Sequence, residues 1–300
     1  MSRPAGGTVL VPCERSAASL RAAWRAGLVA RDLGVPLRLL HVHAAAADTG
    51  DTEAALRQLA RDIGSHLGIE VDLAFGAGDA LAETVRAARE AALVVIGTQR
   101  GNPLRELVLG THAERLIRLC RVPVLVVKRP PTGAYRRVLA PVELGPDAGA
   151  VIAAAMRLTR GPGLEVLHAL DTRDEIGMRA CEVPEPVVRR HRQRAAQRAR
   201  DVLQEMIAGI TTGGQQAVAA VGYGDAAALV LARERAVRAE LVVIGKRMRG
   251  LLADFFLGGV TQRVLAAARA DVLVLPRPGR DGVAEGTGAL AWPLRPDLAR

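Results

Sequence analysis

Short apolar segments alternate with longer amphipathic segments through the first 130 residues of this chain. The apolar segments are rich in Val, Leu and Ile, as is typical of buried strands. The segments between them begin at Ser16 or Asp79 and stop at Gly34 or Gly68, residues typical of helix ends. We therefore predict strands at residues 8–11, 37–42, 69–75, 93–96 and 124–128, and helices at 16–32, 51–67, 79–90 and 110–119.

The spacing of these elements indicates the fold class. Strands separated by helices of this length are joined by right-handed crossovers, which make neighbouring strands parallel. We expect an α/β fold in which an open parallel five-stranded sheet carries helices on both faces, as in Rossmann-type proteins.

The second half of the chain repeats the first. Leu93–Gly97, with the sequence LVVIG, recurs 148 residues later at Leu241–Gly245. The Leu-Gly pair at 109–110 and the apolar run at 124–127 recur at the same offset. We predict two tandem domains of one fold, related by a pseudo-two-fold axis.

The boundary between the domains is marked by composition. Arg129–Gly133 continues neither a helix nor a strand, because it contains two prolines and a glycine. We place the first domain at 1–130 and the second at 131–277, with an insertion at about 171–200 between its second and third strands. Residues 278–300 lack periodicity and are expected to form a loosely ordered tail.

Composition narrows the class of protein. Half of the residues are hydrophobic but only 2% are aromatic, so we expect a core of Ala, Val, Leu and Ile. No apolar run reaches the roughly 18 residues that span a bilayer, and the first residues contain no apolar secretion signal. Three cysteines without a Cys-x-x-Cys spacing indicate free thiols and a cytoplasmic protein.

The net charge of +10 raises the question of nucleic-acid binding. Nearly all basic residues are arginines spread over both halves, with Lys128 and Lys246 as the only lysines, which indicates a compositional bias. The few aromatic residues are scattered instead of lining a basic groove, so we do not expect a nucleic-acid ligand. The arginine-rich stretch at 189–200 is either a solvated helix face, which we favour, or a docking surface for an acidic partner or nucleic acid.

One edge of the predicted sheet is suited to ligand binding. In an open parallel sheet, ligands lie beyond the carboxyl ends of the strands where the strand order reverses, here between the first and fourth strands. That reversal brings together the loops at 12–16 and 97–111. The second loop leads into a helix whose free N–H groups favour an anion, and Thr111 adds a hydroxyl donor. These features predict a nucleotide-type site in the first domain.

Several segments also carry a resemblance to a known family. They are Val9–Pro12, Leu40–Val42, Ile96–Thr98, Leu109–Leu116 and Val122–Lys128. In order and spacing these segments resemble the signature of universal stress proteins, and the resemblance extends over residues 7–277 as a tandem pair. It implies an adenine nucleotide alpha hydrolase-like fold and a role in stress-related binding or signalling, with slow or no ATP hydrolysis.

ATP-binding members of that family place a glycine, two residues, a second glycine, nine residues, and a third glycine followed by Ser or Thr. Gly97, Gly110 and Thr111 match this pattern, whereas Arg100 occupies the middle glycine position and Gly101 follows one place late. An arginine there either blocks close approach of the backbone or pairs with phosphate. The resemblance implies ATP or a related adenine nucleotide in the first domain, bound by Pro12, Cys13, Glu14, Val42, Ile96, Gly97, Arg100, Gly101, Gly110, Thr111 and His112.

The second domain has lost parts of this pattern. Gly245 and Gly258 are in place, but Met248 occupies the middle glycine position and Gly259 replaces the hydroxyl residue. Glu143 stands where the family has an acidic residue after the first strand. We expect a degenerate site there, kept as a scaffold or pairing surface.

The resemblance also implies partners. Last strands often pair across a dimer in this family, and a tandem chain can make that contact internally through 124–128 and 272–276. We also expect a homodimer and a protein partner of unknown identity. We expect no association with a membrane. The alternative function is an interaction scaffold that binds no nucleotide and uses the basic helical insertion.

Other candidates for chemistry are weaker. His41 and His43 have a spacing that metal ligands can use, but no Cys or carboxylate set accompanies them. His168 repeats His41, which favours a structural histidine. Cys13 is either a thiol whose pKa Arg15 lowers or a small residue chosen for packing, which we favour. Because no such set accompanies the histidines, we expect no metal site. The sequence also contains no nucleophile elbow and no Walker lysine, so we expect no strong catalysis.

Overall fold

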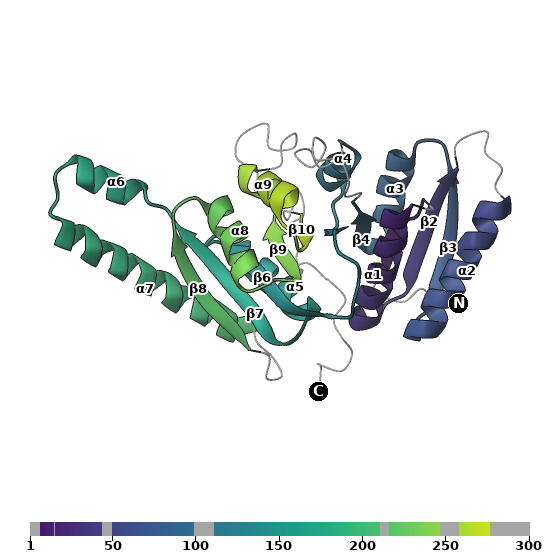
Figure 1. The fold of residues 1–300 in the computed structure, drawn as a ribbon, viewed down its shortest axis with the longest axis horizontal. Helices are drawn as coiled ribbons and strands as arrows, with labels where there is room; N and C mark the ends of the chain where they lie inside the picture. Colours follow the sequence, from purple (N-terminus) through teal and green to yellow (C-terminus); the bar gives the residue numbers. More distant parts are fainter. Residues whose placement is uncertain are drawn as a thin grey trace, which may run out of the picture. The chain divides into compact units, whose positions relative to one another are not determined.

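The chain forms two compact units in the computed structural model, which describes residues 7–14, 16–43, 50–98, 111–210, 216–246 and 258–276 (Figure 1). The first unit comprises residues 1–134 together with 246–300, and the second comprises Tyr135–Gly245. The closing segment of the second sequence repeat therefore belongs to the first unit. The tail predicted at 278–300 lies outside the described residues.

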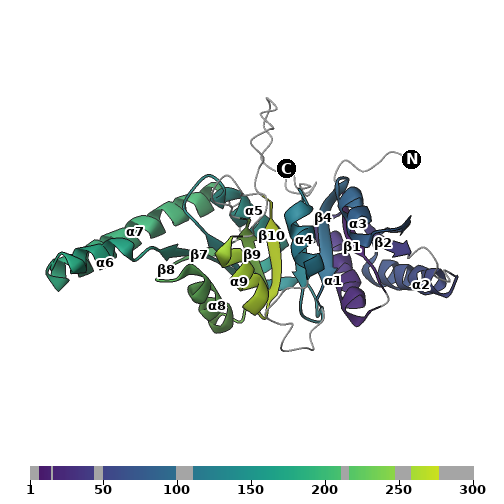
Figure 2. The ribbon, with the colours of Figure 1, turned by 90° about the horizontal axis from the view of Figure 1, so that it is seen from above.

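The first unit is a doubly wound α/β layer. It consists of β1 (Thr8–Pro12), α1 (Ala17–Leu33), β2 (Leu37–His43), α2 (Gly50–Leu67), β3 (Val71–Ala77), α3 (Ala80–Ala88), β4 (Ala91–Gly97), α4 (Thr111–Leu119), β5 (Val124–Val127), α9 (Gly259–Ala267) and β10 (Asp271–Leu275). The strand order is β3-β2-β1-β4-β5-β10, and β1 to β5 run parallel. Figure 2 shows α1 and α2 on one face of this sheet and α3 and α4 on the other. The predicted fold class is confirmed.

The last strands of the two sequence repeats pair with each other. β10 runs antiparallel to β5, with Val272 opposite Val126 and Val274 opposite Val124. This is the internal contact that the family resemblance led us to expect, and it lies within the first unit.

The predicted helix ends are confirmed where a short-range signal marks them. Ser16 caps α1, because its hydroxyl oxygen accepts the N–H of Ser19 at 3.1 Å. Gly34 ends the same helix in the left-handed conformation with φ 69°, which glycine adopts without strain. Asp79 caps α3 through the N–H groups of its first turn.

The third strand starts later than predicted. The sequence suggested 69–75, but β3 covers Val71–Ala77. The N–H of Ile69 donates to the carbonyl of Gly64 and so belongs to the closing turn of α2. The strand begins only after that turn is complete.

The core of the first unit is aliphatic, as the composition predicted. Val9–Val11 and Leu93–Val95 are buried in the centre of the sheet. α1 presents an alanine face to the strands, and small side chains there let the helix lie close to the sheet. The fully buried members of that face are Ala22, Ala23, Ala26 and Ala30.

The second unit repeats this strand order. It consists of β6 (Tyr135–Val142), α5 (Ala148–Leu158), β7 (Thr159–Leu170), α6 (Arg173–Ala180), α7 (Glu185–Ile210), β8 (Ala217–Tyr223), α8 (Ala226–Ala236) and β9 (Leu241–Gly245). These strands are parallel in the order β9-β6-β7-β8, the counterpart of β4-β1-β2-β3. The duplication seen in the sequence is therefore a duplication of topology.

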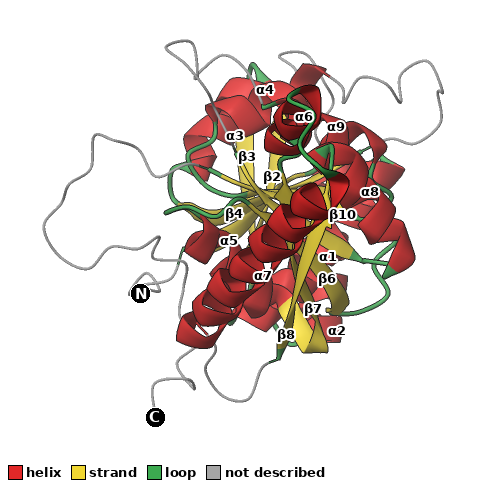
Figure 3. Ribbon diagram, turned by 90° about the vertical axis from the view of Figure 1, so that its left-hand side faces the viewer, coloured by secondary structure: helices red, strands yellow, loops and turns green. Residues whose placement is uncertain are grey.

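The predicted insertion forms a helical hairpin. α7 has 26 residues, against 18 in α2 of the first unit. The separate helix α6 precedes it and was not predicted. α7 runs alongside β8, with its long axis clearly seen in Figure 3.

Across the described ranges, no helix combines the length and apolar character needed to cross a membrane.

Candidate functional site

The strand order of the first unit reverses between β1 and β4. β1 pairs in parallel with β2 on one side and with β4 on the other. The turn after β1 and the connection after β4 therefore leave the sheet at the same edge, as predicted for a ligand crevice. Of the predicted site residues, Pro12, Cys13 and Glu14 lie at or just beyond the end of β1, Val42 lies near the end of β2, and Ile96 and Gly97 end β4.

Pro12 and Val42 are less buried than the apolar residues that precede them in their strands. Val9–Val11 are buried in β1, whereas Pro12 at the end of the strand is half-buried. Val42 is also half-buried, although Leu39 and Leu40 before it are buried. Pro12 and Val42 thus provide accessible apolar surface, and Glu14 adds an exposed carboxylate.

Hydrogen bonds fix the turn that carries Glu14. The N–H of Cys13 donates to the carbonyl of Leu40 at 2.8 Å, which extends the parallel ladder beyond Pro12. The Ser19 hydroxyl donates to the carbonyl of Glu14 at 2.5 Å. α1 therefore holds in place the backbone that carries the exposed carboxylate of Glu14, a group that accepts hydrogen bonds from hydroxyl donors.

Gly97 has a packing role that the sequence did not indicate. A Cβ atom at this position would lie 2.2 Å from the carbonyl oxygen of Ala18 in the first turn of α1. Only glycine lets α1 pack this closely against the end of β4. The guanidinium of Arg21, also on α1, donates to the carbonyl of Thr98 at 3.3 Å. The fold alone therefore explains the glycine at 97.

The remaining predicted residues are those that the family resemblance led us to expect around phosphate. Arg100, Gly101 and Gly110 lie outside the described residues. α4 begins at Thr111, one residue after the predicted start, and the side chains of Thr111 and His112 lie outside the described part as well. In a strand–helix–strand crossover, the helix starts at the carboxyl edge of the sheet, so the first turn of α4 lies at the same edge as the ends of β1 and β4.

Cys13 lacks the properties of a reactive thiol. Its side chain is 1% exposed, and burial raises the pKa of the thiol, with a smaller opposing effect from its hydrogen bond with Ser19. A reactive cysteine needs a lowered pKa and access to solvent. The structure supports the packing interpretation of Cys13; Arg15 lies outside the described residues.

The strand-end histidines are structural. His41 donates its Nδ1–H to the carbonyl of Cys13 at 2.8 Å, and His168 makes the same bond to Val142 in the second unit at 3.0 Å. His43 stacks on the ring of Phe75. Among the described residues, no group of three or more His, Cys, Asp or Glu side chains is arranged to hold a metal ion. The repeated bond shows that this histidine ties the second strand to the turn after the first.

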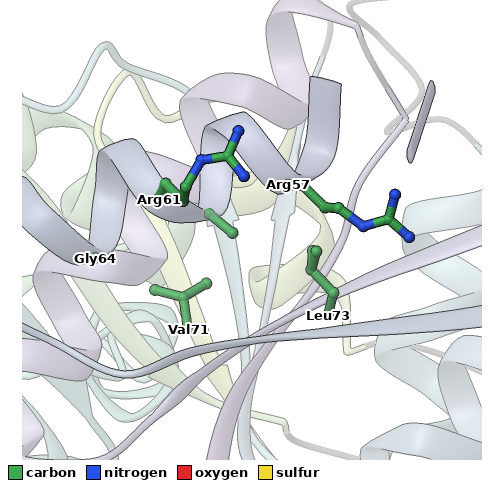
Figure 4. Close-up of a pocket in the computed structure, with 6 residues that line it drawn as sticks. Arg57, Arg61, Gly64, Val71 and Leu73 are labelled. Carbon is green, nitrogen blue, oxygen red and sulfur yellow. The ribbon is translucent and has the colours of Figure 1, made fainter. Parts of the chain in front are cut away.

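Two surface hollows of the first unit lie apart from this edge. One, of about 290 Å³, places Arg57 and Arg61 of α2 over Val71 and Leu73 of β3 (Figure 4). Arg57 there is already paired with Glu53 at 2.6 Å. The other, of about 440 Å³, lies between α3 and α4. Neither is lined by a residue of the predicted set.

The two lysines of the chain hold helix ends, a role that sequence reasoning missed. Lys128 Nζ donates to the carbonyls of Leu265 and Ala268 at the end of α9, at 2.6 and 2.8 Å. Lys246 Nζ donates to the carbonyl of Arg118 at the end of α4, at 2.9 Å. A cation at a helix C-terminus complements the helix dipole. The only sign of this role in the sequence was that the two lysines are rare among so many arginines.

A buried carboxylate completes this arrangement. Asp271 is fully buried at the start of β10, and its Oδ1 accepts the N–H groups of Lys128 and Arg129 at 2.8 and 3.1 Å. Its Oδ2 lies 3.4 Å from Nε of Arg25 on α1. These contacts tie the closing segment of the chain to the first unit.

Comparison with known families shows two consecutive matches to the universal stress protein family, at residues 7–128 and 134–276. The chain belongs to this family. It is a tandem universal stress protein, since the two matches cover separate copies. A comparison with curated proteins gives no significant match.

Solved structures of universal stress proteins share the fold. One from Archaeoglobus fulgidus DSM 4304 has a TM-score of 0.66 and 18% identity, covering 91% of this chain and 100% of its own. A protein from Pseudomonas aeruginosa UCBPP-PA14, described as a universal stress protein, has a TM-score of 0.65 and 23% identity, covering 91% of this chain and 94% of its own. At these identities the likeness concerns the fold.

The second universal stress protein copy differs at the edge that corresponds to the crevice. α5 has no side-chain cap at Asp147, whereas Ser16 caps α1. Among the described residues, the nearest atom to a Cβ at Gly245 would be Val151 Cγ2 at 3.5 Å, so α5 packs less closely against β9 than α1 does against β4. α9 begins at Gly259, which has no hydroxyl. Met248, predicted at the middle glycine position, lies outside the described residues.

Proposed function

We propose that this universal stress protein binds an adenine nucleotide, with ATP as the first candidate, at the crevice between β1 and β4. The observation that carries the proposal is the accessible apolar surface of Pro12 and Val42, next to the exposed Glu14, at the point where the strand order reverses. Apolar surface suits a purine ring, and a carboxylate suits the hydroxyl groups of ribose.

The phosphates of the nucleotide are assigned to the start of α4. Its first N–H groups have no partners within the helix and favour an anion. Arg100, Gly101, Gly110, Thr111 and His112 complete the proposed phosphate loop. The proposed role is sensing or signalling in a stress response, with at most slow hydrolysis.

The proposed location is the cytoplasm. Cys13, Cys120 and Cys181 are free thiols, and Cys181 is exposed. An exposed thiol stays reduced most readily in a reducing compartment.

Isothermal titration with ATP tests the site through a matched pair of variants. Val42→Glu places a negative charge at the proposed purine surface and is expected to weaken binding more than about tenfold. Ala169→Glu makes the same change at the corresponding position of the second copy, which follows His168 as Val42 follows His41, and is expected to leave binding unchanged. Gly110→Val, in the predicted phosphate loop, is expected to abolish binding.

Two results would contradict the proposal. One is equal ATP affinity in wild type and Val42→Glu. The other is a wild type without ATP affinity, which would leave the interaction scaffold as the alternative function.

A further inference from the structure

The helical insertion of the second unit exposes a concentrated positive charge. Residues 186–200 of α7 contain six arginines and no acidic residue. Arg192 is paired with Glu175. The other five are exposed and form no side-chain hydrogen bond or ion pair with any described residue, and they equal half of the net charge of +10. They are Arg189, Arg190, Arg194, Arg198 and Arg200.

Three of these arginines form a row along one face of α7. Arg190, Arg194 and Arg198 follow one another at four-residue spacing, about 6 Å apart along the helix axis. The buried residues of α7, such as Ala196 and Leu203, lie on the opposite face. Like charges at this spacing repel and disfavour the helix. Within the described part of the fold, none of these three arginines forms an ion pair with an acidic side chain.

The row is presented on a well-supported helix. The Glu175 side chain, 5% exposed, accepts two hydrogen bonds from Nε of Arg192, at 2.8 and 3.0 Å. The Arg192 guanidinium lies over the ring of Tyr223 on β8, 5.1 Å from its centre. The Tyr223 hydroxyl donates to the Arg192 carbonyl at 3.2 Å. A helix that is already ordered loses little conformational entropy when a partner binds to it.

The ends of the row favour a short partner over a nucleic acid. Continuing along the same face, Asp201 and Glu205 follow Arg198, and the half-exposed Val187 precedes Arg190. A nucleic acid extends its phosphates past both ends of such a row and meets like charge at Asp201 and Glu205. A short acidic segment fits between these ends.

We propose that the α7 row docks an acidic helical segment of a protein partner. The segment has carboxylates at four-residue spacing opposite Arg190, Arg194 and Arg198, and an apolar residue against Val187. Complementary charges across such a surface set the partner and its register. This inference does not depend on nucleotide binding.

Fluorescence anisotropy with a labelled synthetic helical peptide tests the inference. The peptide carries Glu at every fourth position and a Leu at one end, and is titrated with the full chain at about 0.15 M salt. The triple variant Arg190→Gln/Arg194→Gln/Arg198→Gln is expected to bind at least about tenfold more weakly than wild type. The control Arg57→Gln/Arg61→Gln/Arg86→Gln removes the same charge from α2 and α3 and is expected to stay within about twofold.

Reversing the charge of the three arginines distinguishes specific pairing with the peptide from general electrostatic attraction. Arg190→Glu/Arg194→Glu/Arg198→Glu should prefer a peptide in which Lys replaces Glu, with circular dichroism showing that both triple variants keep their helix content. Unchanged peptide affinity in the glutamine variant would overturn the inference. Tighter binding of a labelled DNA duplex than of the peptide would overturn it in favour of a nucleic acid.

Discussion

The identity of Gly97 is determined by its close packing against α1. A Cβ there would lie 2.2 Å from Ala18 O, whereas the nearest described atom to a Cβ at Gly245 would lie 3.5 Å away. Gly97→Ala is therefore expected to lower the free energy of unfolding by about 1–3 kcal/mol or more. Gly245→Ala, the matched change in the second copy, should cost less than about 0.5 kcal/mol.

Urea unfolding followed by circular dichroism measures both Gly97→Ala and Gly245→Ala. Equal losses of stability in the two variants would show that α1 does not pack against β4 as described.

The three cysteines are expected to differ in reactivity. Burial raises the pKa of Cys13, and it raises the pKa of Cys120 to about 11. Cys181 is exposed. A thiol reagent at about pH 8 should label one cysteine in the native chain, and labelling should disappear in Cys181→Ser. Rapid labelling of a second thiol before unfolding would contradict the burial of Cys13 or Cys120.

Single residues were predicted well where the signal is local. Ser16, Asp79 and Gly34 mark helix ends through bonds to neighbours in the sequence, and all three were predicted. The packing role of Gly97 depends on Ala18, which is distant in the sequence. A contact between distant residues leaves no local pattern in the sequence. Gly97 was therefore interpreted only as a match to the glycine pattern of the family's ATP-binding members.

At the scale of elements, α6 shows why the periodicity of apolar residues can fail. This helix buries Glu175 and leaves Ile176 61% exposed, the reverse of the usual pattern. The burial of Glu175 is tolerated because Arg192 of α7 pairs with it. A helix held by an ion pair has no apolar stripe, and the sequence therefore did not reveal it.

The pairing of α6 with α7 is expected to depend on pH. Hydrogen bonds from Arg192, with smaller effects of Arg179 and His191, hold the pKa of Glu175 below its ordinary value of 4.5. A lowered folded-state pKa means that the pair stabilises the fold fully above about pH 4.5 and that this stability is lost as the pH falls through the folded-state value. Glu175→Gln should therefore unfold at lower urea concentration than wild type at about pH 7.

The difference in stability between wild type and Glu175→Gln should shrink between about pH 5 and pH 3. Urea titrations at both ends of this interval measure it. A difference that stays constant would show that Glu175 does not titrate with a lowered pKa.

At the scale of the whole molecule, the duplication in the sequence predicted the strand order. It did not predict that α9 and β10 pack in the first unit. The order β3-β2-β1-β4 and its counterpart β8-β7-β6-β9 follow from repeated crossovers, which the sequence displays. The placement of α9 and β10 in the first unit depends on Lys128 and on the buried Asp271. Those contacts join distant parts of the chain and have no counterpart in the sequence repeat.

The two copies share a strand order but differ at the edge of the proposed site. The first keeps a side-chain cap on α1, the tight packing at Gly97 and an accessible Val42, whereas the second has no side-chain cap at Asp147 and no hydroxyl at the start of α9. A duplicated fold with one retained site is expected to bind one ligand for each chain.

The stoichiometry of ATP binding tests this account most directly. Isothermal titration of the wild-type chain should give one ATP bound per chain, with the affinity weakened by Val42→Glu and unchanged in Ala169→Glu. Two equivalent sites, or no binding at all, would contradict a nucleotide site confined to the first copy.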